Sequence, residues 1–434
     1  MTLSAPLRFW PREATTGHLR KNGLVAGPGA VERARKGDSI ACRVREPPAE
    51  IPAKGSPMGS HFGETIHVAC GCSGHPREKA MSETSLPAVA AHGATRLPSV
   101  DLDSYNVELK DDEGFIGDRA SKGAFRDIIE NWRDALRKLG EDPLGDDESE
   151  DLTKKKLDDL LTHGDPKAAG IVQAAIDEFS QEVALVIRRF LKIKEWKDTQ
   201  RIVVGGGFRA SRVGELVIGR AAVILAAEKI DVDLVPIHNN PDEAGLMGAV
   251  HLAPAWMFKA FDAVLGVDIG GTNMRAGVIQ LNLKKAPDLS KSKVWKFSLW
   301  RHGDEEGVNR EHAVDSLVEM LKGLIATAGK KGVKLAPFIG IGCPGVIEGD
   351  GSIDRGAQNL PGNWESKKFN LPLVVHSQIP RIGDEDTSIV LHNDAVVQGL
   401  SEVPYMHDVE RWGILTIGTG LGNARFTNRR QGKP

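Results

Sequence analysis

Three short apolar segments that each end in a cluster of glycines constrain the fold of this chain more than any other sequence feature. They are "RIVVGGGF" (201–208), "AVLGVDIGGTN" (263–273) and "WGILTIGTGLG" (412–422). Runs of β-branched residues bounded by glycines predict strands that end in tight turns. Because amphipathic helical patterns separate these strands, the sequence predicts an α/β protein.

The helices between the strands are predicted from the spacing of apolar residues. In the segment 121–139, Ser121 is a plausible N-cap, and the predicted buried stripe is Phe125, Ile128, Ile129, Trp132 and Leu136. A long helix is predicted to begin at Asp165-Pro166 and to run to about Trp196. Further helices are expected over 152–161, 211–227, 241–253, 310–329 and 395–402, and further strands over 231–237, 338–345 and 388–394.

The first 100 residues are expected to form a disordered or non-native extension. Residues 1–80 are rich in Gly, Pro, Ala and Arg and show neither helical nor strand periodicity. Translation starting at Met81 and a specific binding tail are two alternative explanations of this segment. It carries a net charge of +5, which leaves −8 on residues 81–434, so nucleic acid is not expected as the main partner.

The cysteines and the hydropathy indicate a cytoplasmic protein. Cys42, Cys70 and Cys72 lie in the first 80 residues, and only Cys343 lies in the remainder. Cys70 and Cys72 lack the second spaced pair that zinc sites usually supply, so no metal site is expected there. No apolar run is long enough for a membrane helix, and no secretory signal pattern is present, so we expect neither membrane association nor export.

The glycine turns are candidate anion sites. Glycines allow backbone N–H groups to approach a phosphate closely, and hydroxyl and amide side chains add donors. None of the turns matches the P-loop or the dinucleotide-binding pattern, and each taken alone is equally consistent with an ordinary turn. The candidate residues are Gly270, Gly271, Thr272 and Asn273; Gly418, Thr419, Gly420 and Gly422; and Gly205, Gly206 and Gly207.

Two aspartates at strand ends complete a set of groups suited to phosphoryl transfer. Asp268 ends one predicted strand, and Asp394 lies where the strand in "VLHNDAV" meets a helix. An isolated Asp at such a position is often only an N-cap. Phosphoryl transfer to an alcohol needs a base near the hydroxyl, an acid that supports a metal, and backbone donors around the phosphates. Asp394, Asp268 and the turns would supply these three roles.

Five motifs in residues 264–425 together resemble the ROK group of sugar kinases (repressor, open reading frame, kinase). These are "VLGVDIGGTNMRAGVI", "IGIGCPGVI", "NLPGNW", "HNDA" and "LTIGTGLGNA". The resemblance implies a two-lobed actin-like ATPase (ribonuclease H-like) fold and an ATP-dependent, glucokinase-like kinase that phosphorylates a hexose or a related sugar.

The resemblance also implies roles for individual residues. Asp394 would be the general base, and Asp268 would support Mg²⁺ through water. The turns 270–273 and 418–422 would hold phosphates, and 205–207 would receive adenosine. The positions that would hold sugar hydroxyls are Asn359, Asn393 and Asp394.

The order of the motifs departs from the family pattern. In such kinases the adenosine turn and the helix "AGLxGA" follow the second phosphate motif, whereas here "VVGGG" (203–207) and "EAGLMGA" (243–249) precede the first one. We therefore expect a circular permutation, with a nucleotide-side lobe at 105–255 and a lobe at 262–434 that carries both phosphate motifs and the sugar site. Two adjoining incomplete kinase copies are the alternative.

A second departure concerns zinc. Many members carry a cysteine-rich zinc motif, and the corresponding stretch "DEGFIGDRASKGAF" (112–125) has no Cys, so structural zinc is not expected. Glu113 or Asp118 is a candidate for the sugar-binding acid of that motif, with a solvated surface acid as the alternative for either residue.

Other side chains are expected to be structural. Cys343 and His392 are predicted to be buried, and His238 and His251 lack metal-ligand spacing. Trp364 is predicted either to stack on a sugar or to pack in the core.

Two other functions stay open at this stage. One is a sugar-sensing transcriptional regulator of the same family, although the N-terminal helix-turn-helix of such regulators is not evident here. The other is a glucokinase that uses polyphosphate as the donor. A homodimer is also an open alternative.

Overall fold

The computed structural model describes residues 91–112 and 114–429. The predicted extension up to residue 90 and Glu113 lie outside the described residues. In the part of the chain that is described, no helix is long and apolar enough to cross a membrane.

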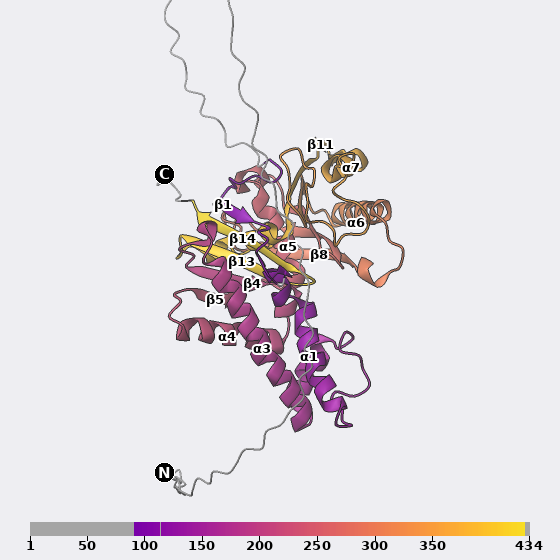
Figure 1. The fold of residues 1–434 in the computed structure, drawn as a ribbon. Helices are drawn as coiled ribbons and strands as arrows, with labels where there is room; N and C mark the ends of the chain where they lie inside the picture. The colour runs from indigo at the N-terminus through magenta and orange to yellow at the C-terminus, as the bar shows by residue number, and fades with distance from the viewer. Residues whose placement is uncertain (1–90, 113, 430–434) are drawn as a thin grey trace, which may run out of the picture. The chain divides into compact units, whose positions relative to one another are not determined.

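Two five-stranded sheets form the centre of the fold (Figure 1). The first sheet has the order β1-β14-β13-β4-β5 and the second has the order β12-β9-β6-β7-β8. When the second sheet is read from β8, each sheet has three strands in antiparallel pairing followed by two strands in parallel pairing. The strands are β1 (Val100–Tyr105), β4 (Arg201–Gly205), β5 (Asp233–Pro236), β6 (Ala263–Ile269), β7 (Met274–Gln280), β8 (Lys293–Trp300), β9 (Leu335–Cys343), β12 (Ser388–Asn393), β13 (Arg411–Ile417) and β14 (Leu421–Asn428).

Eight α-helices accompany these sheets in the described residues. They are α1 (Lys122–Arg137), α2 (Lys154–His163), α3 (Pro166–Phe190), α4 (Arg212–Ala227), α5 (Pro241–Ala249), α6 (Arg310–Lys330), α7 (Leu371–Gln378) and α8 (Asp394–Leu400). Two short hairpins, β2 (Lys110–Asp111) with β3 (Gly114–Phe115) and β10 (Arg381–Ile382) with β11 (Glu385–Asp386), complete the fold. This α/β architecture with two similarly ordered sheets agrees with the predicted actin-like ATPase fold.

Strand β1 completes the first sheet from the opposite end of the described chain. Val100 pairs with Asn428, and the Arg429 N–H donates to the Ser99 carbonyl at 3.1 Å. The end of β14 and the start of β1 are therefore neighbours in an antiparallel pair, although more than 300 residues separate them. The sheets do not follow the predicted division of the chain into lobes at 255–262. The residues of strands β13 and β14 were predicted to belong to the second lobe, but they lie in the sheet of β4 and β5.

The segment before β1 is ordered and packed, which differs from the predicted extension up to residue 100. Leu97 is buried, and the backbone N–H of Gly93 donates to the Leu391 carbonyl at 3.0 Å. The Leu391 N–H in turn donates to Nδ1 of His92 at 3.0 Å. The segment therefore contacts β12 directly before Asn393 and Asp394.

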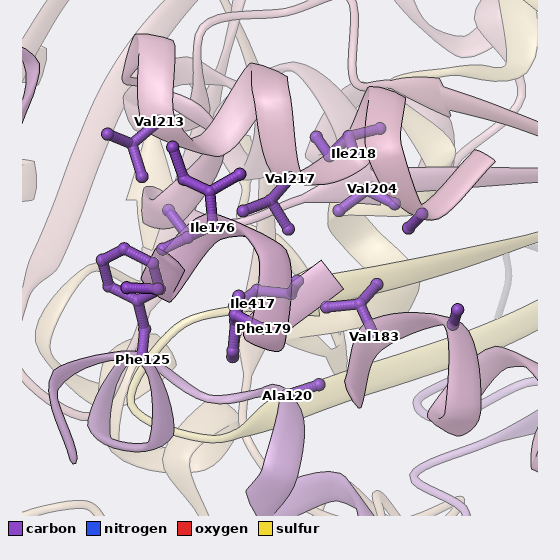
Figure 2. Close-up of a cluster of buried hydrophobic side chains, with 14 of the residues drawn as sticks. Ala120, Phe125, Ile176, Phe179, Val183, Val204, Val213, Val217, Ile218 and Ile417 are labelled. Atoms are coloured by element: carbon purple, nitrogen blue, oxygen red, sulfur yellow. The ribbon is translucent and has the colours of Figure 1, made fainter. Parts of the chain in front are cut away.

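Mainly aliphatic side chains pack around Phe125 and Phe179 in the core beside α3 (Figure 2). Phe125, Phe179 and Phe208 contact one another with ring centroids 5.1–5.3 Å apart. Burying such side chains contributes about 1.5–3 kcal/mol each. The predicted N-caps are also confirmed, since Ser121 Oγ accepts from the Ala124 N–H and the Asp165 carboxylate accepts from the Lys167 N–H.

One face of α1 differs from the prediction. Trp132 is 39% exposed, whereas Arg133 is fully buried. The Arg133 guanidinium donates to Asp142 and Ser149 and to the carbonyls of Gly145 and Asp147. A charged residue is thus buried because the acidic loop that follows α1 satisfies its donors. The long helix α3 ends at Phe190, earlier than predicted, and Trp196 is buried in a short 3₁₀ turn.

Candidate active site

A cavity of about 830 Å³ contains most of the residues that the sequence singles out. It is lined from the second sheet by Asp268 and the turn Gly270–Asn273, and from the first sheet by the turn Gly418–Gly422 and by Gly206 and Gly207. Asp394 and Asn359 line it as well. Residues more than 200 positions apart therefore share one space.

Asp394 is the first residue of α8, directly after β12. Asn393, not Asp394, caps the helix, because Asn393 Oδ1 accepts the backbone N–H groups of Ala395 and Val396 at 3.0 and 3.2 Å. The Asp394 side chain is thereby left to line the cavity. Loss of hydration, followed by the nearby negative charge of Asp268, raises the pKa of Asp394 to about 7. A carboxyl group with such a pKa can accept a proton effectively near neutral pH.

Asp268 is the penultimate residue of β6 and is almost completely buried. Burial raises its pKa, and the Arg275 guanidinium, 3.2 Å away, acts in the opposite direction. Arg275 also contacts Asp242 at 2.7 Å, so it connects β7 with the start of α5.

Gly245 of α5 explains how this helix can lie against Asp268. A Cβ atom at position 245 would be 2.4 Å from Cγ of Asp268. Since real side-chain carbons do not approach so closely, glycine is required for α5 to pack here. The glycine of the motif "EAGLMGA" therefore allows α5 to pack directly against the Asp268 side chain.

The first phosphate-type turn is braced by a residue that the sequence analysis missed. Within the turn, the Gly270 N–H donates to the Asn273 carbonyl at 2.8 Å. His302 is buried, and its Nε2 lies 2.9 Å from the Gly270 carbonyl. The Gly303 N–H donates to the Thr272 carbonyl at 3.0 Å. The only sequence signal for this contact is a histidine after a strand, which is too common to predict it.

The turn after β13 and the turn after β4 also line the cavity, and each has its own backbone geometry. In the turn between β13 and β14, the Gly418 N–H donates to the Gly420 carbonyl at 3.0 Å. Gly206 has a φ of +82°, and a Cβ there would lie 2.4 Å from the Ile417 carbonyl oxygen, so glycine is required on both counts. Gly205 belongs to β4 and is not among the residues that line the cavity.

Only some of the residues predicted to bind the sugar line the cavity. Asn359 lines the cavity. Asn393 is 2% exposed, and besides capping α8 it donates from Nδ2 to the Gly345 carbonyl at 3.0 Å. Its side chain is therefore engaged in the protein, in contrast to the predicted contact with a sugar hydroxyl. Glu113 lies outside the described residues, whereas Asp118 lines the cavity.

Several side chains predicted to be structural are indeed buried. Cys343 and His392 are fully buried. Burial lowers the pKa of His392 to about 4 and raises that of the Cys343 thiol. Trp364 is 1% exposed, and its indole N–H donates to the Pro361 carbonyl at 2.8 Å, so core packing is the correct alternative for this residue.

Three cations that the sequence analysis missed also line the cavity. They are Lys122, Arg126 and Lys154. Lys122 and Lys154 are the first residues of α1 and α2, and a lysine at a helix start is usually no more than a solvated side chain.

The site has the donors that Mg²⁺ would require. Mg²⁺ is usually bound by one or two carboxylates together with waters and substrate phosphates. Asp268 and Asp394 are close enough for one charge to raise the pKa of the other, and a cation would relieve that repulsion. Within residues 91–112 and 114–429, no group of three or more His, Cys, Asp or Glu side chains is arranged to hold a metal.

The fold brings Asp268 and Asp394 into one cavity with two phosphate-type turns from different sheets. Over 169 residues the chain is 29% identical to the glucokinase of Thermotoga maritima, which covers 38% of this chain and 44% of that protein. No family model matches. The chain is thus similar to a glucokinase over part of its length, and it spans less than half the length of the curated relative that it matches.

Two solved structures show partial similarity. One is a ROK hexokinase from Thermus thermophilus, with 24% identity, a TM-score of 0.27 and coverage of 37% of this chain and 45% of the hexokinase. The other is a Listeria monocytogenes protein described as a candidate N-acetylmannosamine kinase, with 21% identity, a TM-score of 0.28 and coverage of 38% and 47%.

Proposed function

We propose that this chain is an ATP-dependent sugar kinase that transfers the γ-phosphoryl group of ATP to a hydroxyl group of a hexose or a related sugar. The observation that carries the proposal is the position of Asp394. Its carboxyl group has a pKa of about 7 and lines the same cavity as two glycine turns from different sheets. The similarity to a glucokinase supports the same class of substrate.

In the proposed reaction Asp394 accepts the proton of the sugar hydroxyl as its oxygen attacks the γ-phosphorus, and ADP leaves. The backbone N–H groups of the turns 270–273 and 418–422 would orient the phosphates. Gly206 and Gly207 would face the nucleoside, and Asn359 the sugar. Mg²⁺, when bound through water to Asp268, would neutralise charge on the phosphates.

The test is a panel of hexoses and N-acetylhexosamines with ATP and Mg²⁺, in which ADP release by the full chain is measured. We expect turnover with at least one sugar and its loss in Asp394→Asn. Asp315→Asn, which changes an exposed carboxylate on α6, is the matched control and should retain turnover. The absence of ADP release with every sugar, or full activity of Asp394→Asn, would contradict the proposal.

We also propose that the chain is one circularly permuted kinase unit rather than two partial copies. The pairing of β14 with β1 supports this, because each sheet then holds five strands in the same order. The 13 residues between α5 and β6 would be the connection that replaced the original chain ends.

A further inference from the structure

Lys122, Arg126 and Lys154, here called the cationic cluster, line the cavity, and two of them contact the glycine turns. The backbone N–H of Lys122 donates to the Gly418 carbonyl at 2.9 Å. Lys154 Nζ donates to the Gly207 carbonyl at 2.8 Å. Because these contacts involve the turns after β13 and β4, the cluster lies at the end of the cavity that the donor would occupy.

The cationic cluster has excess positive charge. The pKa of Lys122 is lowered, first by burial and then by the charges of Arg126 and Lys154. Among the described residues, no carboxylate lies within 4.0 Å of the charged nitrogens of the cluster, although Asp118 and Asp151 line the same cavity. Like charges held together without a carboxylate partner favour the binding of an anion.

Lys122 and Lys154 are exposed side chains, and their positions at two helix starts place both of them on the cavity together with Arg126. Lys122 begins the 16-residue helix α1, and Arg126 follows one turn later, while Lys154 begins the 10-residue helix α2. Two helix starts, each with a partial positive charge, therefore line the same cavity. Core packing through Phe125 and Leu157, both buried, fixes these helix starts in place.

We propose that the cationic cluster binds the phosphate chain of the donor beyond the phosphoryl group that is transferred. This inference rests on the proposed kinase function and adds the residues that would hold the phosphate chain of the donor. A nucleoside triphosphate and inorganic polyphosphate share this chemistry, so the experiment includes both. The cluster positions the donor, and Asp394 acts on the acceptor.

The test measures binding by titration calorimetry with the full chain, using ATP with Mg²⁺ in one arm and long-chain inorganic polyphosphate in the other. The variants are Lys122→Ala, Arg126→Ala, Lys154→Ala and the triple variant. Loss of one charge-assisted contact to phosphate should raise Kd about tenfold, and the triple variant should raise it at least about 100-fold. The control is Lys155→Ala, which removes an exposed lysine of α2 that does not line the cavity and should leave Kd unchanged.

Two further readouts separate a positioning role from a fold defect. Lys122→Arg keeps the charge and should restore most of the affinity lost in Lys122→Ala. Added salt should weaken binding less in the triple variant than in the wild type, because fewer charges contribute. Circular dichroism of each variant should match the wild type.

The outcomes distinguish the donors and the two proposals. A raised Kd in either arm supports the inference, and the arm that responds identifies the donor. An unchanged Kd in both arms for the folded triple variant would overturn it, even if sugar phosphorylation is observed. If the variants lose donor affinity but no sugar is phosphorylated, the kinase proposal fails and the donor site stands.

Discussion

Replacement of Asp394 by Asn should abolish phosphoryl transfer and at the same time stabilise the protein at alkaline pH. The carboxyl group has a pKa of about 7 in the folded chain, against an ordinary value of 3.8. The folded protein therefore binds more protons than the unfolded chain between these values, so stability is lost as the pH rises from about 4 to about 7. Asn carries no charge and avoids this loss.

The size of the effect follows from the shift of the pKa. At about 1.4 kcal/mol per pKa unit, the shift sets an upper limit of about 4 kcal/mol at pH 8. The side chain reaches the water of the cavity and is coupled to Asp268, so we expect roughly half of that limit, about 2 kcal/mol. For a chain of this size that corresponds to a rise in Tm of about 3 °C.

The assay compares the thermal unfolding of the wild type, Asp394→Asn and the control Asp315→Asn at pH 8 and at pH 4.5. The difference between Asp394→Asn and the wild type should be largest at pH 8 and small at pH 4.5, while the control shows no such trend. Activity of Asp394→Asn should fall by at least about 100-fold, the usual contribution of a general base. Equal Tm shifts at both pH values, or a lower Tm at pH 8, would refute the reasoning about this buried charge.

Three further predictions concern the same site. In the wild type, kcat/KM should rise with pH through about 7, since Asp394 must lose its proton to act as a base; a profile flat from pH 5 to 9 would argue against that role. Gly245→Ala should lower kcat/KM at least about 100-fold by displacing Asp268, whereas Gly219→Ala, in open space on α4, should stabilise the chain by about 0.5–1 kcal/mol in chemical denaturation. A rejoined chain that starts at residue 260 and connects 429 to 91 through about 12 Gly/Ser residues should fold and keep its activity; failure to fold would contradict the permuted unit.

Local patterns were sufficient to predict many elements of the fold. The strand β6 and the turn after it follow from a β-branched run that meets paired glycines. The caps at Ser121 and Asp165 were predictable because a cap is a contact within three residues. Strands β1, β7, β8 and β14 and helix α7 were not among the predicted elements. In β1 only Val100 and Leu102 alternate with polar residues, and so short a pattern does not predict a strand.

The candidate site was predictable only in part. Asp268 and Asp394 were visible as acids at strand ends, and the structure places both in one cavity. Asn393 was assigned to the sugar because a motif does not reveal that its amide caps α8. The cationic cluster was not predicted, because a lysine at the start of a helix is common. Only the tertiary structure shows that the starts of α1 and α2 line the same cavity.

The sequence by itself determined several of the turns, many of the strands and helices, and which residue types could perform phosphoryl transfer. Backbone sterics and hydrophobic periodicity act over a few residues and can be read directly from the chain. Only the tertiary structure decided that β1 pairs with β14, that Arg133 is buried, and that Asp394 has a pKa of about 7. These properties depend on hydration and on charges supplied by residues far away in the sequence, so no local pattern contains them.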